Sequence, residues 1–385
     1  MSDAVEPFRL TVPQAELDDL RERLSRTRWP DRETVDDTGQ GPPLAKVQAL
    51  CAHWRDGYDW RRCEALLNGF GQSRTEIGGL GIHVLHVRSP EPDALPLVMT
   101  HGWPGSVLEF RHVIGPLTDP AAHGGDPRDA FHLVIPSLPG FGFSDKPTRT
   151  GWGVARIAGA WVELMRRLGY GRRWGAQGGD WGSAVTTALG FMAPAGLVGV
   201  HLNFVLFQPT EEEVMQATPH ERAMLDDARR YDERFSAYMK LQATRPQAIG
   251  YSLADSPAGL AAWLYALFQD VSDSGGEPER AFSVDEMLDD IMLYWLPNAG
   301  ASSARLYWEA MGPAASGGPP PGPMRTPAGI SMFPGEPVRL SRRWAERRFA
   351  RLVHFRELDR GGHFAALEQP AAFVEEVRAT FRALR

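Results

Sequence analysis

The segment 177–182, Gln-Gly-Gly-Asp-Trp-Gly, restricts the fold most, because it leads a short apolar stretch directly into a helical pattern. The stretch 174–176 is typical of a buried strand, and 183–189 is typical of a helix. Small residues on both sides of Asp180 permit a sharp strand-to-helix turn that lifts its side chain above a sheet. A glycine-rich turn in which Asp180 only caps the helix is the alternative, and this segment alone leaves both interpretations open.

Strand and helix patterns alternate on both sides of this turn. Continuous apolar runs such as 97–99 and 133–135 indicate strands of a buried parallel sheet, and Gly-Gly-Leu-Gly at 78–81 indicates a hairpin. Alternation of this kind predicts an α/β fold with a mainly parallel central sheet. The predicted strands are 74–77, 82–88, 97–99, 133–135, 174–176, 330–333 and 352–358, and the predicted helices beside them are 157–168, 183–189 and one from Pro370 on.

The chain of 385 residues is long enough for two or three units or for one domain with insertions. Strand patterns stop near Phe207, and a helical region rich in Tyr and Trp follows. It ends in the stretch 312–329, where six Pro and five Gly occupy 18 positions and predict a loop. A helical pattern at 44–67 belongs to a first segment that we expect to pack on the core. The predicted units are an N-terminal helical segment (1–70), an α/β core (71–206 and 327–385) and an inserted helical cap (207–326).

Composition excludes several classes of partner. With 41 Lys and Arg against 48 Asp and Glu, the net charge of −7 argues against nucleic acid or an anionic membrane. The most apolar stretch, 191–207, is interrupted by Pro194, His201 and Asn203, so we expect no membrane anchor. The start of the chain lacks a signal-peptide pattern. Because Cys51 and Cys63 are the only cysteines, we expect a cytoplasmic protein without disulfides.

Two backbone N–H groups are candidates for binding a negatively charged oxygen beside Asp180. The loop His-Gly-Trp-Pro-Gly at 101–105 follows the predicted strand 97–99. In α/β-hydrolases this loop and the residue after the nucleophile supply the N–H groups of the oxyanion hole. The spacing therefore predicts an oxyanion hole formed by the N–H groups of Trp103 and Trp181.

A histidine and an acid complete the constellation. Gly-Gly-His-Phe at 361–364 follows the last predicted strand, and Glu336 ends the strand before it. The chain order Asp180, Glu336, His363 matches the nucleophile, acid and base of α/β-hydrolases. A surface carboxylate is the alternative reading of Glu336, and Asp359 or Glu357 could compete with it as the acid.

The chain resembles a known family, the microsomal and juvenile-hormone type of epoxide hydrolase, in a soluble bacterial form. The resemblance covers nearly the whole chain and rests on several motifs together. The membrane anchor of the microsomal enzymes has no counterpart here, and the Pro/Gly stretch 312–329 is longer than in that pattern. The motifs that carry the resemblance are 54–61, 67–70, 101–106, 139–144, 177–182, 238–246, 255–262 and 360–366.

The resemblance implies an enzyme that opens an epoxide to a vicinal diol in two steps. Asp180 would form a covalent ester, and His363, oriented by Glu336, would activate the water that cleaves it. Six of the eight tyrosines lie in the insertion, and the resemblance selects Tyr238 and Tyr307 as donors to the epoxide oxygen. Without the resemblance, amphipathic packing would be the better explanation for all six.

Two other functions stay open at this stage. A haloalkane dehalogenase uses the same aspartate, and the indoles of Trp103 and Trp181 could bind a halide. A hydrolase-fold binding protein without chemistry is the other alternative. No cofactor or metal is expected, because no fingerprint for either occurs. The expected partners are a small-molecule epoxide, with a bulky apolar or aryl group, and water. The oligomeric state stays open, with a homodimer as one option.

Overall fold

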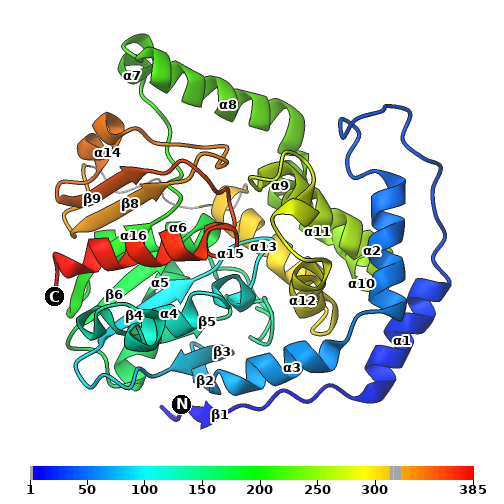
Figure 1. The fold of residues 1–385 in the computed structure, drawn as a ribbon, viewed down its shortest axis with the longest axis horizontal. Helices are drawn as coiled ribbons and strands as arrows, with labels where there is room; N and C mark the ends of the chain where they lie inside the picture. Colours follow the sequence, from blue (N-terminus) through cyan, green and yellow to red (C-terminus); the bar gives the residue numbers. More distant parts are fainter. Residues whose placement is uncertain (1–2, 313–314, 316–321) are drawn as a thin grey trace.

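The computed structural model describes residues 3–312, 315 and 322–385. Within them, one sheet has the strand order β1-β2-β3-β5-β4-β6-β7-β8-β9; Figure 1 labels these strands except β7. β1, β2, β3 and β5 pair antiparallel in turn, and from β5 to β9 every pair is parallel. The strands are β1 (Glu6–Pro7), β2 (Gln72–Ile77), β3 (Leu80–Val87), β4 (Leu95–Thr100), β5 (Phe131–Pro136), β6 (Trp174–Gly178), β7 (Leu197–Leu202), β8 (Ala328–Met332) and β9 (Leu352–Glu357).

The mainly parallel α/β fold predicted from the sequence is confirmed. The expected hairpin is formed by β2 and β3, which pair from Gln72 with Leu85 to Ile77 with Leu80 around the turn at Gly78 and Gly79. Two strands were not predicted. β1 has only two residues, and β7 contains Gly199 and His201, which interrupt its apolar pattern.

Amphipathic helices cover the sheet. α5 (Val154–Arg167) buries Ile157, Trp161 and Leu164 on one face, as its spacing predicted. α6 (Asp180–Met192) packs against α5 and against β4, β6 and β7, while the C-terminal helix α16 (Pro370–Arg382) packs against β7, β8 and β9. The remaining helices of this part are α4 (Ile114–Thr118), α14 (Arg342–Arg348) and α15 (Ala365–Glu368), with 3₁₀ helices η1 (Val107–Phe110), η2 (Ala121–His123) and η3 (Pro127–Asp129).

The sheet is interrupted between β7 and β8 by a helical insertion. Its long helix α8 extends over one end of the molecule in Figure 1, and α9, α10 and α13 pack against one another. Of the predicted loop 312–329, residues 313–314 and 316–321 lie outside the described residues. The insertion consists of α7 (Glu211–Met215), α8 (Pro219–Phe235), α9 (Ala237–Thr244), α10 (Pro246–Asp255), α11 (Pro257–Val271), η4 (Pro278–Arg280), α12 (Val284–Trp295) and α13 (Gly300–Met311). None of the described helices is long and apolar enough to cross a bilayer.

The N-terminal segment runs along the side of the molecule, as Figure 1 shows, and contacts the insertion. It contains α1 (Gln14–Ser25), α2 (Leu44–Asp56) and α3 (Trp60–Gly69). The prediction of one continuous helical stretch at 44–67 was wrong. α2 ends at Asp56, with Gly57 as its C-cap, and α3 begins after Asp59, whose side chain accepts a hydrogen bond from the N–H of Arg61. An N-cap of this kind starts a helix in a new direction.

A buried carboxylate joins the N-terminal segment to the insertion. The side chain of Asp289 on α12 is fully buried and accepts hydrogen bonds from the hydroxyl of Tyr58 and from the guanidinium groups of Arg62 and Arg111, all at 2.7 Å. Three donors satisfy one carboxylate, and removing it would leave the buried partners without an acceptor.

We predict that Asp289→Ala lowers the free energy of unfolding by about 3–5 kcal/mol, the range for breaking a buried ion pair from one side. Urea unfolding followed by far-ultraviolet circular dichroism measures it. The matched control is Asp285→Ala on the same helix, whose carboxylate pairs with His53 at 39% side-chain exposure and should cost less than about 1 kcal/mol. Equal losses in the two variants would contradict the account.

Candidate active site

Asp180 lies at the turn between β6 and α6 with a φ of +46°, in the left-handed region. Two neighbouring glycines make this turn possible. A Cβ at Gly178 would lie 2.1 Å from the carbonyl oxygen of Gly182, and one at Gly182 would lie 1.8 Å from that of Thr100. No larger residue fits at either position, so the Gly-x-Asp-x-Gly spacing follows from backbone packing. A strained φ at a non-glycine residue is typical of functional sites.

The Asp180 carboxylate points toward the loop 101–105 and away from its own helix. Its Oδ1 accepts a hydrogen bond of 2.7 Å from the N–H of Trp103, and the N-cap of α6 is Gly179. The capping interpretation of Asp180 is therefore wrong. Among the described residues no hydrogen bond uses the N–H of Trp181, which leaves this donor unused beside the carboxylate.

His363 lies between Asp180 and Glu336. Its Nε2 is 3.5 Å from Asp180 Oδ2, and its Nδ1 is 3.0 and 3.1 Å from the two carboxylate oxygens of Glu336. The Glu336 side chain is fully buried, which contradicts the surface reading of this residue. Of the two competing acids, Glu357 pairs with His220 and Asp359 is exposed. The structure thus brings the predicted aspartate, histidine and acid together.

The charges around His363 determine its protonation. Burial alone would lower its pKa, but the negative charges of Glu336 and Asp180 outweigh burial and hold the pKa well above its ordinary value. Burial raises the pKa of Glu336, and the neighbouring His363 opposes this increase. While Asp180 is ionised, His363 therefore carries a proton near neutral pH.

Two tyrosines of the insertion face the Asp180 carboxylate across a small cavity. The ring of Tyr238 stacks on Trp103 with centroids 5.0 Å apart, and the ring of Tyr307 meets Trp181 edge-on at 4.8 Å. Burial, together with the nearby charge of Asp180, raises the pKa of both hydroxyls well above 10. Both are therefore neutral donors at physiological pH.

Tyr231 belongs to the same group, although the motifs did not select it. Its hydroxyl is 2.9 Å from that of Tyr238. It comes from α8, while Tyr238 comes from α9. A spacing of seven residues across a break between two helices carries no helical-face signal, so only the structure could place it there.

The cavity that contains Asp180 has a volume of about 80 Å³ and a mostly apolar wall. His363 and the two candidate tyrosines lie on this wall with the nucleophile candidate. The remaining wall is formed by Trp103, Trp181, Ala184, Phe204, Leu206, Tyr231, Met239, Leu267, Val271, Met311, Pro337 and Val338.

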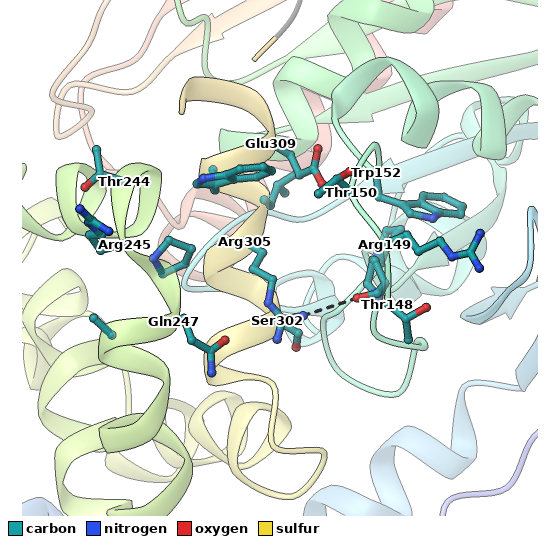
Figure 2. A pocket seen from close by; sticks show the side chains of 16 residues that line it. Thr148, Arg149, Thr150, Trp152, Thr244, Arg245, Gln247, Ser302, Arg305 and Glu309 are labelled. Carbon is teal, nitrogen blue, oxygen red and sulfur yellow. Dashed lines mark hydrogen bonds between the residues drawn. The ribbon is translucent and has the colours of Figure 1, made fainter. Parts of the chain in front are cut away.

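A larger cleft of about 630 Å³ lies elsewhere against α13 and is shown in Figure 2. The residues Thr148 to Trp152 line one side, Thr244 to Gln247 line the other, and Arg305 extends from α13 between them. None of the candidate catalytic side chains lines this cleft. Its size alone does not make it a reaction site, and we assign the chemistry to the smaller cavity.

Two family models match overlapping parts of the chain. Residues 5–110 match the model described as the epoxide hydrolase N terminus. Residues 96–248 match the model of the α/β-hydrolase fold. The first match covers the N-terminal segment and the loop 101–105, and the second covers the Asp180 turn and the first helices of the insertion.

Relatives and solved structures point to the same family. A candidate epoxide hydrolase of Stigmatella aurantiaca (strain DW4/3-1) is 56% identical over 99% of this chain and 86% of its own length. Epoxide hydrolase 1 of Sus scrofa is 32% identical over 98% and 88%. The structure of Aspergillus niger epoxide hydrolase superimposes with a TM-score of 0.88 at 29% identity, covering 99% of this chain and 97% of the other. With this sheet, this turn and these relatives, the chain belongs to the epoxide hydrolase family of the α/β-hydrolase fold.

Proposed function

We propose that this enzyme hydrolyses an epoxide to a vicinal diol through an ester on Asp180. The observation that carries the proposal is that Asp180, His363, Tyr238 and Tyr307 line one cavity and that the buried Glu336 pairs with His363. The first step needs a nucleophile and an acid on opposite sides of the ring, and the second needs a base beside the nucleophile.

In the first step, Asp180 attacks a ring carbon. Because Oδ1 is held by the N–H of Trp103, Oδ2, which lies 3.5 Å from Nε2 of His363, is the atom that forms the new bond. The carbon–oxygen bond of the ring breaks, and its electron pair goes to the epoxide oxygen. Tyr238 or Tyr307 donates a proton to that oxygen, and solvent later restores it. Attack at a saturated carbon suits a carboxylate, whose ester can then be hydrolysed at its carbonyl.

Ester formation also prepares the second step. It removes the negative charge of Asp180, which is one of the causes that hold the pKa of His363 high. The imidazole then releases its proton to solvent. It next accepts a proton from a water molecule, whose oxygen attacks the carbonyl carbon of the ester. The resulting oxyanion lies at Oδ1, between the N–H groups of Trp103 and Trp181. Collapse of the tetrahedral intermediate breaks the bond between the carbonyl carbon and Oδ2. The second proton of the attacking water passes to the departing alkoxide, so that the diol leaves with Oδ2 and one water-derived oxygen stays on Asp180.

The wall of the cavity supports a substrate with a bulky apolar or aryl substituent. Tryptophan, phenylalanine and methionine side chains surround the carboxylate, and polar groups are few. The relatives favour this reaction over dehalogenation, and the assembled nucleophile, acid and base argue against a protein that only binds. For location we propose the cytoplasm, because Cys51 and Cys63 are both free thiols.

A single turnover in ¹⁸O-labelled water tests the ester directly. With enzyme in excess over styrene oxide, we expect the first diol to carry no label, because its new oxygen comes from Asp180. Enzyme that has first turned over in labelled water should transfer the label to diol in ordinary water. Mass spectrometry of the diol measures both. Label in the first diol would show direct attack by water.

Replacement of the donors tests the assignment of the tyrosines. We expect Tyr238→Phe and Tyr307→Phe each to slow ring opening by about a hundredfold or more, the range for losing a general acid. Tyr231→Phe is the comparison variant and should slow ring opening less, because the Tyr231 hydroxyl would act on the epoxide oxygen only through its hydrogen bond with Tyr238. Stopped-flow tryptophan fluorescence measures ring opening. Halide release from chlorinated alkanes at an undiminished rate in both variants would favour dehalogenation.

Protonation of His363 tests the electrostatic link to Asp180. We predict that Asp180→Asn lowers the pKa of His363, because the variant removes one of the two anions that favour the charged imidazole. Histidine resonances in an NMR titration measure the pKa. His354, which pairs with Glu376 away from the cavity, is the internal control and should not change. An unchanged or raised pKa of His363 would contradict the link.

A further inference from the structure

A second, partly buried carboxyl lies beside the site and has no role in the steps above. Glu109 is on η1, in the chain just after the loop that supplies the N–H of Trp103. Its side chain folds back over Gly105, so that a Cβ at Gly105 would lie only 1.3 Å from Glu109 Oε1. The glycine at this position thus provides the space that the carboxyl occupies.

The elements around Glu109 place it next to the catalytic histidine. η1 packs against α15, the short helix that begins two residues after His363. On the other side lies α12, from which Tyr294 donates a hydrogen bond of 2.7 Å to the carbonyl oxygen of Gly105. Glu109 is therefore held between the oxyanion loop and the His363 loop.

Among the charged groups around Glu109, Asp290 on α12 has the largest effect on the pKa of Glu109, which it raises. Both of its carboxylate oxygens are buried and lack a hydrogen-bond partner among the described residues. No hydrogen bond or ion pair involving the Glu109 side chain occurs there either. A buried polar group without a partner costs about 1–3 kcal/mol, so the Asp290 carboxyl is expected to take up a proton or a further hydrogen-bonding molecule.

The surrounding charges favour the protonated forms of this pair. Burial raises the pKa of Asp290 to about 7, opposed by the Ser106 side chain and supported by the charge of Asp289. Burial and then Asp290 raise the pKa of Glu109 well above its ordinary value. Asp180 and Glu336 act in the same direction, and only His363 opposes them. A carboxyl pair that shares a proton can both donate and accept a hydrogen bond.

We propose that Glu109, supported by Asp290, is a positioning residue that holds the water which attacks the Asp180 ester. This inference rests on the proposed function, because it concerns its second step. The water must contact Nε2 of His363 and approach the carbonyl carbon of Asp180. A carboxyl between the two loops is in the right place to accept or donate its remaining hydrogen bond. The observation that distinguishes this role from packing is that the Glu109 side chain, although it lies between the two loops, makes no hydrogen bond or ion pair among the described residues.

The test is the Glu109→Gln variant of the full-length enzyme with styrene oxide. We expect kcat and KM to fall together by about ten- to a hundredfold, the range for a misplaced reactant, while kcat/KM stays within about twofold. In this mechanism kcat/KM reports ring opening and kcat reports ester hydrolysis. Intact-protein mass spectrometry should show the ester accumulating at steady state. The pH dependence of ester hydrolysis should also change, because one titrating group is lost.

Two further variants keep the test decisive. Gly105→Ala retains the carboxyl but displaces it, and we expect the same split between kcat and kcat/KM. Glu376→Gln is the control for losing a buried glutamate, since its carboxylate already binds Ser331, His354 and Arg356. It should show no such split.

The outcomes separate this inference from the function on which it rests. Equal losses of kcat and kcat/KM in Glu109→Gln, or unchanged ester hydrolysis, would overturn the role of Glu109 while leaving the ester mechanism intact. Absence of an ester in every protein, together with label in the first diol, would instead overturn the proposed function.

Discussion

The contact between the Asp180 turn and the end of β4 is the constraint on which the rest of the site depends. The backbone at Gly182 approaches the carbonyl oxygen of Thr100 so closely that no side chain fits between them. Position 102 likewise has no room for a side chain, since a Cβ there would lie 2.1 Å from Asp180 Oδ1. These approaches fix the carboxylate against the N–H of Trp103. They also explain why a residue with positive φ is tolerated at the centre of the site.

Charge in the cavity is unevenly distributed around this fixed carboxylate. Asp180, Glu336 and His363 form a connected charged group, while Tyr238 and Tyr307 on the opposite wall are neutral donors. In a site with little water, each charge acts strongly on the next. In the proposed mechanism the covalent step therefore changes the protonation of His363, so that one residue can carry a proton in the first step and accept one in the second.

Local sequence patterns were sufficient to predict most of the sheet and the group of two acids and one histidine that lie together at its edge. Asp180, Glu336 and His363 each follow a strand, and the carboxyl ends of parallel strands meet at one edge of a sheet. Tyr238 and Tyr307 were selected by family resemblance, because no comparable rule predicts where the helices of the insertion place their side chains. The break at Gly57 was missed because apolar spacing continues through it. Tyr231 and Glu109 were missed because their roles depend on contacts between elements far apart in the chain.

Trapping the ester would test the central claim most directly. The His363→Ala variant should open the epoxide but fail to cleave the ester, because it lacks the base that activates water. After mixing with styrene oxide, we predict that its intact mass rises by the mass of one epoxide and that the added group maps to the peptide containing Asp180. An unmodified protein, or an adduct on another residue while the wild-type enzyme forms diol, would contradict the account.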